Sequence, residues 1–213
     1  NLRIVNSNGN DVNGNSFSEK VNNIMQVFRQ NGFLTYKQII EKELSYKTIL
    51  KMAREGIIEI EEKGMYRLPD FYLDEFFILQ YRFPKGVFSL ETALFLHGLS
   101  LTIPFEITMS FPYGTNTKNI KKAGVRPIIL RSNFDEGIIE IECISGQSIK
   151  VYERERILIE CLRAVHQVDV QIVAPAFKQY FQSNQVNVSK LFYYAQLFKV
   201  MDKLQAYTEV LYS

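Results

Sequence analysis

The sequence has no tryptophan, only two cysteines and two histidines, and no long apolar run. Cys143 and Cys161 lie in apolar stretches and fit no metal-ligand spacing, which favours small buried thiols over a metal site or a disulfide framework. No apolar run is long enough to span a bilayer, and the polar, Asn-rich first residues do not match a signal peptide. These absences favour a protein of the reducing cytoplasm that has no membrane partner.

Recognisable catalytic motifs are also missing. The sequence contains no P-loop, no HExxH, no paired-cysteine motif and no Ser/His/Asp order. Gly114–Lys118 has the composition of a phosphate-binding loop without its glycine spacing, so an ordinary loop is expected there. His97 and His166 each stand at the end of a predicted helix, where a histidine interacts with the helix dipole. We therefore expect no enzymatic activity, no cofactor and no metal site.

Excess charge of one sign is nearly absent as well. The 213 residues carry 25 basic and 23 acidic side chains, which gives a net charge of +2. Residues 18–69 carry nine basic and seven acidic side chains, so this segment is also only +2. The chain is therefore not a strongly basic nucleic-acid binder. Its 16 Phe and 12 Tyr nevertheless supply enough apolar surface for one large or two small domains.

What the sequence does contain is a run of three helical segments followed by a tight β-ribbon. Thr35 and Ser45 are good N-caps, Gly32 is suited to end a helix, and Ile39 and Ile40 are expected to point inward. This order predicts a winged helix-turn-helix domain over residues 17–75, preceded by a flexible leader over residues 1–16. The predicted helices are Glu19–Asn31, Thr35–Lys42 and Ser45–Arg54, and the ribbon is Ile57–Leu68.

The third helix of such a domain lies in the DNA major groove. Its basic side chains are expected to pair with phosphates, and Tyr46 and Thr48 to touch base edges. The alternative is an ordinary solvated helix face, and the glutamates at positions 55, 59, 61 and 62 would repel phosphate. We expect modest affinity per copy, steep salt dependence and a need for two or more copies on one site. The predicted DNA-binding residues are Lys37, Ser45, Tyr46, Lys47, Thr48, Lys51, Arg54 and Lys63.

The remainder of the chain, residues 76–213, predicts a second domain of mixed elements. A connecting helix over residues 70–83 and a helix over 89–97 come first, and strand patterns and then helices follow. This order predicts an α+β fold, with a mixed α/β C-terminal domain that has a small sheet and a helical end. The predicted strands are 106–111, 125–131, 138–144 and 148–152, and the later helices are 154–165, 170–180, 188–201 and 203–211.

A basic neighbourhood follows the first of these strands, and more basic residues lie near residues 154–163. These basic residues are either ordinary solvated positions or a surface for nucleic acid or an acidic partner. The alternating charges at 153–156 are also typical of a salt-bridged helix start. As a surface it would consist of Lys118, Lys121, Lys122, Arg126, Arg131, Arg154, Arg156 and Arg163.

Three ordered stretches resemble the AbiEi-type antitoxins of type IV, or abortive infection, toxin–antitoxin systems. Gly64–Pro69 is similar to the family's G-x-Y-x-x-P wing ending, and Gly86–Leu99 to its GVISxxSALxxHGL segment. Glu155–Glu160 is similar to the ERTLxD helix start, although Ile157 replaces the Thr and Glu160 the Asp. These departures weaken any role assigned to the motif's hydroxyl or carboxylate.

The resemblance implies two functions for one chain. The winged domain represses its own operon by binding double-stranded DNA at inverted repeats, as a monomer that cooperates with other copies on the site. The C-terminal domain opposes a co-encoded nucleotidyltransferase-like toxin without forming a stable complex. The residues alone leave two alternative functions open. One is a ligand-responsive transcription regulator whose second domain is a sensor, and the other, less favoured, is an enzyme.

Overall fold

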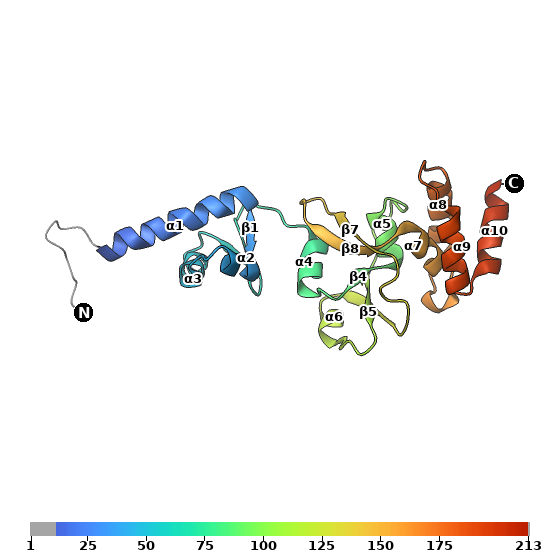
Figure 1. Cartoon of the computed structure of the whole chain (residues 1–213), viewed down its shortest axis with the longest axis horizontal. Coiled ribbons are helices and arrows are strands. Elements are labelled where there is room, and N and C mark those ends of the chain that lie inside the picture. Colours follow the sequence, from blue (N-terminus) through green and yellow to red (C-terminus); the bar gives the residue numbers. More distant parts are fainter. Residues whose placement is uncertain (1–11, 213) are drawn as a thin grey trace. The chain divides into compact units, whose positions relative to one another are not determined.

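The computed structural model describes residues 12–212, and the chain has an α+β fold that divides into two units, Asn1–Leu73 and Asp74–Ser213 (Figure 1). The division falls two residues before the boundary that the sequence predicted. Of the predicted flexible leader, residues 1–11 lie outside the described residues. Residues 12–16 belong to the first helix, so the leader prediction is wrong for them, because each residue added to a nucleated helix gains a backbone hydrogen bond.

The described part of unit 1, residues 12–73, has three helices and a small antiparallel sheet whose strand order is β1-β3-β2. Thr35 closes a capping box with Gln38 at the start of α2, and Ser45 caps α3. The short strand β1 was not predicted, because three residues are too few to show an alternating pattern. The elements are α1 (Val12–Asn31), β1 (Phe33–Thr35), α2 (Tyr36–Glu41), α3 (Tyr46–Arg54), β2 (Glu59–Glu62) and β3 (Met65–Arg67).

A continuous apolar core holds the helices of unit 1 on this sheet. Leu34 of β1 pairs in register with Tyr66 of β3, and both side chains are buried. Ile39 is fully buried but its neighbour Ile40 is 54% exposed, so the prediction that both point inward is wrong. Consecutive helical residues point about 100° apart, and the single short helix α2 presents only one face to the core. The buried members are Ile24, Phe28, Leu34, Ile39, Ile49, Met52, Ile58 and Tyr66.

Gly32 connects α1 to β1 in a conformation that few other residues adopt. Its φ is +75°, and a Cβ atom there would lie 2.1 Å from ring carbons of Phe71. A side chain at this position is therefore excluded both by the backbone angle and by the space. The sequence prediction that Gly32 ends the first helix is confirmed.

Unit 2 is built around a mixed five-stranded sheet with the order β6-β5-β4-β8-β7. Its central strand β4 has only two residues, pairs antiparallel with β5, and meets β8 in parallel at Phe88 and Val151. Two residues carry no periodicity, so the sequence did not predict this strand. The strands are β4 (Val87–Phe88), β5 (Ile107–Pro112), β6 (Val125–Leu130), β7 (Ile138–Glu142) and β8 (Ser148–Tyr152).

The helices of unit 2 pack around α7, whose residues 155–161 are all buried. Helix α7 contacts α5, α8 and α9, and Figure 1 shows α8, α9 and α10 side by side at the C-terminal end. The helices are α4 (Glu75–Arg82), α5 (Leu90–Leu96), α6 (Lys118–Lys122), α7 (Arg154–Cys161), α8 (Val170–Phe181), α9 (Val188–Leu197) and α10 (Met201–Tyr212), with a 3-10 turn η1 (Ala164–His166).

Three helix predictions in unit 2 need correction, and the first is the helix predicted over 154–165, which ends at Cys161 and is followed by the separate 3-10 turn η1. The connecting helix predicted over 70–83 begins only at Glu75, where the Asp74 carboxylate accepts the Phe76 N–H at 2.8 Å. The helix predicted over 188–201 ends at Leu197, because Lys199 takes a left-handed φ of 56°. The short helix α6 was not predicted at all. Within the described residues, no helix has both the length and the apolar character needed to cross a membrane.

Candidate nucleic-acid interface and charged centres

The basic side chains of α3 share one exposed face. Lys47, Lys51 and Arg54 follow one another at helical spacing, and all three are exposed. Together with Phe17 and Lys20 of α1 they line a hollow of about 360 Å³, which Ser45 and Thr48 complete. Five of the eight predicted DNA-binding residues therefore meet in one hollow, and among the described residues no carboxylate lines it. The sequence analysis missed Lys20, which lies on a helix remote in sequence from α3.

The cations of this hollow differ in how strongly they are already engaged. Lys51 Nζ lies 3.7 Å from Glu55 Oε1 and 3.7 Å from the centre of the Phe17 ring. Arg54 Nε donates to the Leu50 carbonyl oxygen at 3.3 Å. Lys47, in contrast, forms no ion pair with any part of the chain that the structure describes. Lys47 and Lys20, which is exposed and likewise has no ion pair within the described residues, are thus the cations most available to an external anion.

Thr48 has a structural role that the sequence analysis did not foresee. Its side chain is 5% exposed, and its hydroxyl donates to Ser45 Oγ at 2.9 Å. Ser45 Oγ in turn accepts the Thr48 backbone N–H at 3.4 Å. The prediction that Thr48 touches base edges is therefore wrong, because a buried hydroxyl that closes the helix cap is not available to a ligand.

Tyr46, the other residue predicted to touch base edges, is 37% exposed. Its hydroxyl lies 3.1 Å from that of Tyr66, and its ring packs edge-on against Tyr36 with centroids 5.3 Å apart. The remaining predicted contacts lie outside the hollow. Lys37 is exposed and 3.7 Å from Glu41, and Lys63 is exposed in the turn between β2 and β3.

The glutamates that follow α3 are largely neutralised. Arg67 of β3 binds two of them, with Nη2 2.5 Å from Glu59 Oε2 and Nε 2.6 Å from Glu61 Oε2. Glu55 is paired with Lys51, as described above. The repulsion of phosphate that the sequence suggested is therefore weaker than four unpaired carboxylates would produce.

The eight basic residues predicted as a second surface do not form one patch. Lys118, Lys121 and Lys122 are exposed on α6, whereas Arg126 and Arg131 stand at opposite ends of β6. Five residues of extended chain span about 16 Å, so these two arginines serve different neighbourhoods. The structure therefore separates what the sequence placed together.

Two more of the predicted surface residues, Arg154 and Arg156, begin α7. Arg154 Nη2 donates to the backbone oxygen of Gln185 at 3.1 Å and to its side-chain oxygen at 3.0 Å. Arg156 is fully buried, which contradicts its prediction as a surface residue. Its Nη1 donates to the carbonyl oxygens of Asn133, at 2.7 Å, and Glu136, and its guanidinium stacks on the Tyr152 ring at 3.5 Å. Burial is tolerated because these acceptors replace water.

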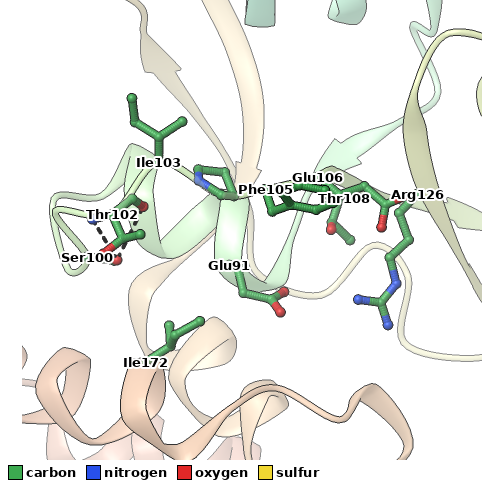
Figure 2. Close-up of a pocket in the computed structure, with 10 residues that line it drawn as sticks. Glu91, Ser100, Thr102, Ile103, Phe105, Glu106, Thr108, Arg126 and Ile172 are labelled. Carbon is green, nitrogen blue, oxygen red and sulfur yellow. Dashed lines mark hydrogen bonds between the residues drawn. The ribbon is translucent and has the colours of Figure 1, made fainter.

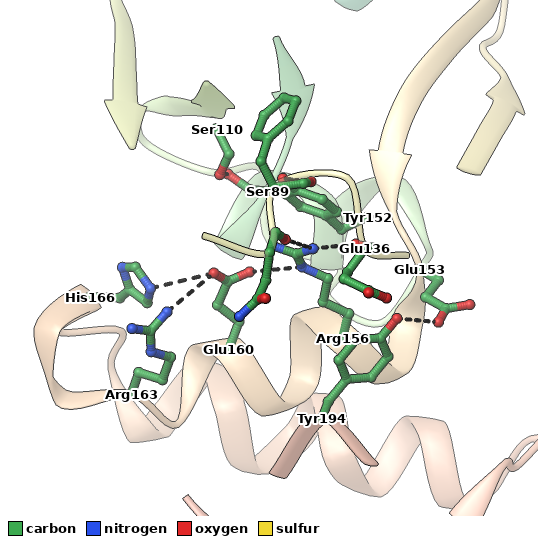
Figure 3. Close-up of polar contacts among 12 residues, drawn as sticks. Ser89, Ser110, Glu136, Tyr152, Glu153, Arg156, Glu160, Arg163, His166 and Tyr194 are labelled. Atoms are coloured by element: carbon green, nitrogen blue, oxygen red, sulfur yellow. Dashed lines mark hydrogen bonds and ion pairs between the residues drawn. The ribbon is translucent and has the colours of Figure 1, made fainter. Parts of the chain in front are cut away.

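Glu160 is the buried carboxylate on which this cluster converges (Figure 3). Arg156 Nε lies 3.4 Å from Glu160 Oε2, while Arg163 Nη1 and His166 Nε2 lie 3.6 and 3.7 Å from Oε1. Burial raises the pKa of Glu160, but the contact with His166 and the charges of Arg156 and Arg163 outweigh it and lower the pKa below its usual value. The carboxylate is thus held ionised in the interior.

Unit 2 has a hollow of its own, of about 320 Å³, beside α5 (Figure 2). Glu91 reaches into it, and Glu91 Oε2 is buried without a hydrogen-bond partner among the described residues. Two apolar side chains of its lining are highly exposed, Ile103 at 75% and Phe105 at 107%. Arg126 also lines the hollow, and its Nη2 donates to the His166 carbonyl oxygen at 3.3 Å.

The histidines and cysteines show no sign of catalytic pairing. His97 caps the end of α5, and its Nε2 lies 2.7 Å from the Tyr152 carbonyl oxygen. Burial lowers the pKa of His97 and raises that of the Cys161 thiol, which is buried as predicted. Cys143 is half-buried. In residues 12–212 no three His, Cys, Asp or Glu side chains are grouped as metal ligands would be.

Comparison with known proteins identifies a shared fold but no family. No protein-family model matches the chain, and no curated protein does. The chain is similar to a crystal structure of the RV2827C protein from Mycobacterium tuberculosis, with a TM-score of 0.55 and 11% sequence identity. The similarity covers 85% of this chain and 71% of that one. At this identity it concerns the α+β fold alone.

Proposed function

We propose that unit 1 is a winged helix-turn-helix domain that binds double-stranded DNA, and that the protein is the antitoxin and autorepressor of a toxin–antitoxin operon. The observation that carries the DNA-binding half is the hollow between α1 and α3. Four basic side chains, Lys20, Lys47, Lys51 and Arg54, line it, with no carboxylate from the part of the chain that the structure describes. A phosphate backbone is the ligand that such a row of exposed cations recognises.

In this proposal α3 lies in the major groove and the ribbon β2-β3 is the wing. Tyr46, at the N-terminal end of α3, presents the partly exposed ring from which base contacts start. Lys63, exposed at the tip of the ribbon, contacts phosphate in the adjacent groove. The small net charge of +2 implies weak binding by one copy, so two or more monomers bind inverted repeats cooperatively.

The antitoxin half is supported by the ordered motifs that resemble the AbiEi-type antitoxins. Two of these stretches lie in unit 2, on β4 with α5 and on α7, and these two helices contact each other. Most of their residues are buried, including the motif pair Arg156 and Glu160. We assign these motifs to the maintenance of the fold, which leaves toxin opposition to exposed residues such as those of α6.

The DNA-binding half is tested with a labelled duplex from upstream of the chain's own operon and a scrambled duplex of equal composition. We expect the upstream duplex to bind more tightly, and a variant with Lys47→Gln and Arg54→Gln to lose binding to both. Lys178→Gln is a matched control, since Lys178 is an exposed lysine of α8 in unit 2. Equal affinity of the unaltered chain for both duplexes would remove the repressor assignment.

The antitoxin half is tested by growth rescue on induction of the neighbouring toxin gene. The full chain and the variant with Lys47→Gln and Arg54→Gln are expected to rescue growth equally, because toxin opposition belongs to unit 2. No rescue by either protein at matched expression would reject the antitoxin assignment and leave DNA binding untouched. Rescue by the unaltered chain alone would show that neutralisation depends on DNA binding, contrary to the proposal.

A further inference from the structure

Four cationic side chains surround a hollow of about 420 Å³ in unit 2, which we call the arginine hollow. Arg131 reaches it from the end of β6, Arg156 and Arg163 from α7 and the residues after it, and Lys199 from the turn after α9. Glu160 is the one carboxylate in its lining. The lining therefore has an excess of positive charge, although the chain as a whole is nearly neutral.

Arg156 forms the buried side of the arginine hollow and has one donor group unused. Its Nη1 and Nε are directed to the carbonyl oxygens of Asn133 and Glu136 and to Glu160. Its Nη2 is buried and has no hydrogen-bond partner among the described residues. A buried, charged donor without an acceptor is unfavourable, so an incoming anion would gain an interaction that the protein itself does not satisfy.

The cations toward the solvent side are available to a ligand. Lys199 is exposed and forms no ion pair within the described part of the chain. Arg131 is exposed, with its guanidinium 5.0 Å from the Tyr113 ring centre. Arg163 is half-buried, and its Nη1 lies 3.6 Å from Glu160 Oε1, an oxygen that His166 Nε2 also approaches, at 3.7 Å. Within the described residues Lys199 and Arg131 form no ion pair, so each can turn to an anion without breaking one, whereas Arg163 would give up part of its contact with Glu160.

The backbone on two sides of the hollow is held in an uncommon conformation. Asn133 and Lys199 have φ values of 58° and 56°, in the left-handed region that non-glycine residues seldom occupy. Asn133, in the turn after β6, and Lys199, in the turn after α9, both line the same hollow.

We propose that the arginine hollow binds the phosphate group of a small molecule the size of a mononucleotide. Guanidinium groups match phosphate oxygens with paired N–H donors, and a lysine adds a mobile point charge. Phe198 and Leu197 supply an apolar wall for the base, and the volume lies in the range of small-molecule sites. The site goes beyond DNA binding and does not depend on it.

The proposal is tested by calorimetric titration of the full chain with AMP and with inorganic phosphate, at constant ionic strength. We expect AMP to bind at least about tenfold more tightly than phosphate, because the apolar wall contacts only the nucleotide. Lys199→Gln and Arg163→Gln are each expected to weaken AMP binding about tenfold or more, since each removes a charged hydrogen bond. Lys178→Gln is expected to leave it unchanged.

Lys199→Gln is the decisive variant, because the exposed ammonium has no structural partner whose loss could unfold the domain. Equal affinity for AMP and phosphate, binding by neither ligand, or AMP binding that survives both substitutions would each overturn the proposal. Tighter binding of a 5′-phosphorylated single strand than of AMP, lost with Lys199→Gln, would overturn it in favour of a nucleic-acid end. The variant with Lys47→Gln and Arg54→Gln should bind AMP normally, so a failure of the DNA-binding proposal can be distinguished from a failure of the AMP-binding proposal.

Discussion

Removing single charges from the hollow of unit 1 should change how DNA affinity depends on salt. If Lys20, Lys47, Lys51 and Arg54 each neutralise one phosphate, the slope of log K against log salt is about −3.6. That slope corresponds to a loss of roughly 150-fold in affinity between about 50 and 200 mM salt. Lys47→Gln should reduce the magnitude of the slope, to about −2.7, and the loss of affinity over the same salt range to roughly 40-fold.

Lys51 should behave differently from Lys47 because its ammonium already lies 3.7 Å from Glu55. Binding DNA through Lys51 means giving up part of that pair, and the Glu55 carboxylate then remains close to the phosphates. We therefore expect Lys51→Gln to reduce affinity less than Lys47→Gln. Glu55→Gln should increase affinity about two- to fivefold on any sequence, the effect of one partly exposed charge.

The assay is fluorescence anisotropy of a labelled duplex titrated with each variant at four salt concentrations. Lys178→Gln provides the control, because it removes an exposed lysine from unit 2. A slope that Lys47→Gln and Arg54→Gln both leave unchanged would refute the assignment of α3 to the phosphate backbone. Equal losses from Lys51→Gln and Lys47→Gln would refute the argument from the Glu55 pair.

Three further predictions concern the stability of the fold and are tested by urea unfolding. Tyr180→Phe should cost about 2 kcal/mol, because the buried hydroxyl donates to Glu155 Oε1 at 2.6 Å, whereas Tyr193→Phe, on an exposed ring, should cost less than about 0.5 kcal/mol. Ser45→Ala should cost about 1 kcal/mol through loss of the α3 cap, and an unchanged midpoint would contradict that role. Burial lowers the pKa of folded His97 below 6.5, so the unfolded state binds the proton first and stability should fall as pH drops below 6.5. His97→Gln should flatten this pH dependence, and an equally steep profile would show that another group is responsible.

Sequence reasoning succeeded where the signal was local. The caps Thr35 and Ser45, the terminating Gly32 and the hairpin of β7 and β8 each depend on a few neighbouring residues, and all are present in the structure. It failed for β1 and β4, since strands of three and two residues owe their existence to partners elsewhere in the chain.

Thr48 and Arg156, two predicted site residues that the structure buries, were misplaced for a related reason. Thr48 is one turn from the buried Met52, and this spacing was the signal that Thr48 faces the core. Arg156 gave no such signal, because its acceptors are backbone carbonyls of Asn133 and Glu136, in a loop 20 or more residues earlier. A run of alternating charges looks the same in the sequence whether its side chains are solvated or bind a distant loop, so the burial of Arg156 could not be predicted from it.

The two-residue strand β4 has a consequence for the order in which unit 2 folds. Strands β4, β5 and β6 lie within residues 87–130, and β7 and β8 form a local hairpin. The two halves of the sheet are joined through Phe88 and Val151, a contact of long sequence separation that closes slowly. Until residue 152 has left the ribosome, β4 therefore presents an open edge with two apolar side chains destined for the core. A nascent chain halted between residues 130 and 152 should be the species most prone to aggregate.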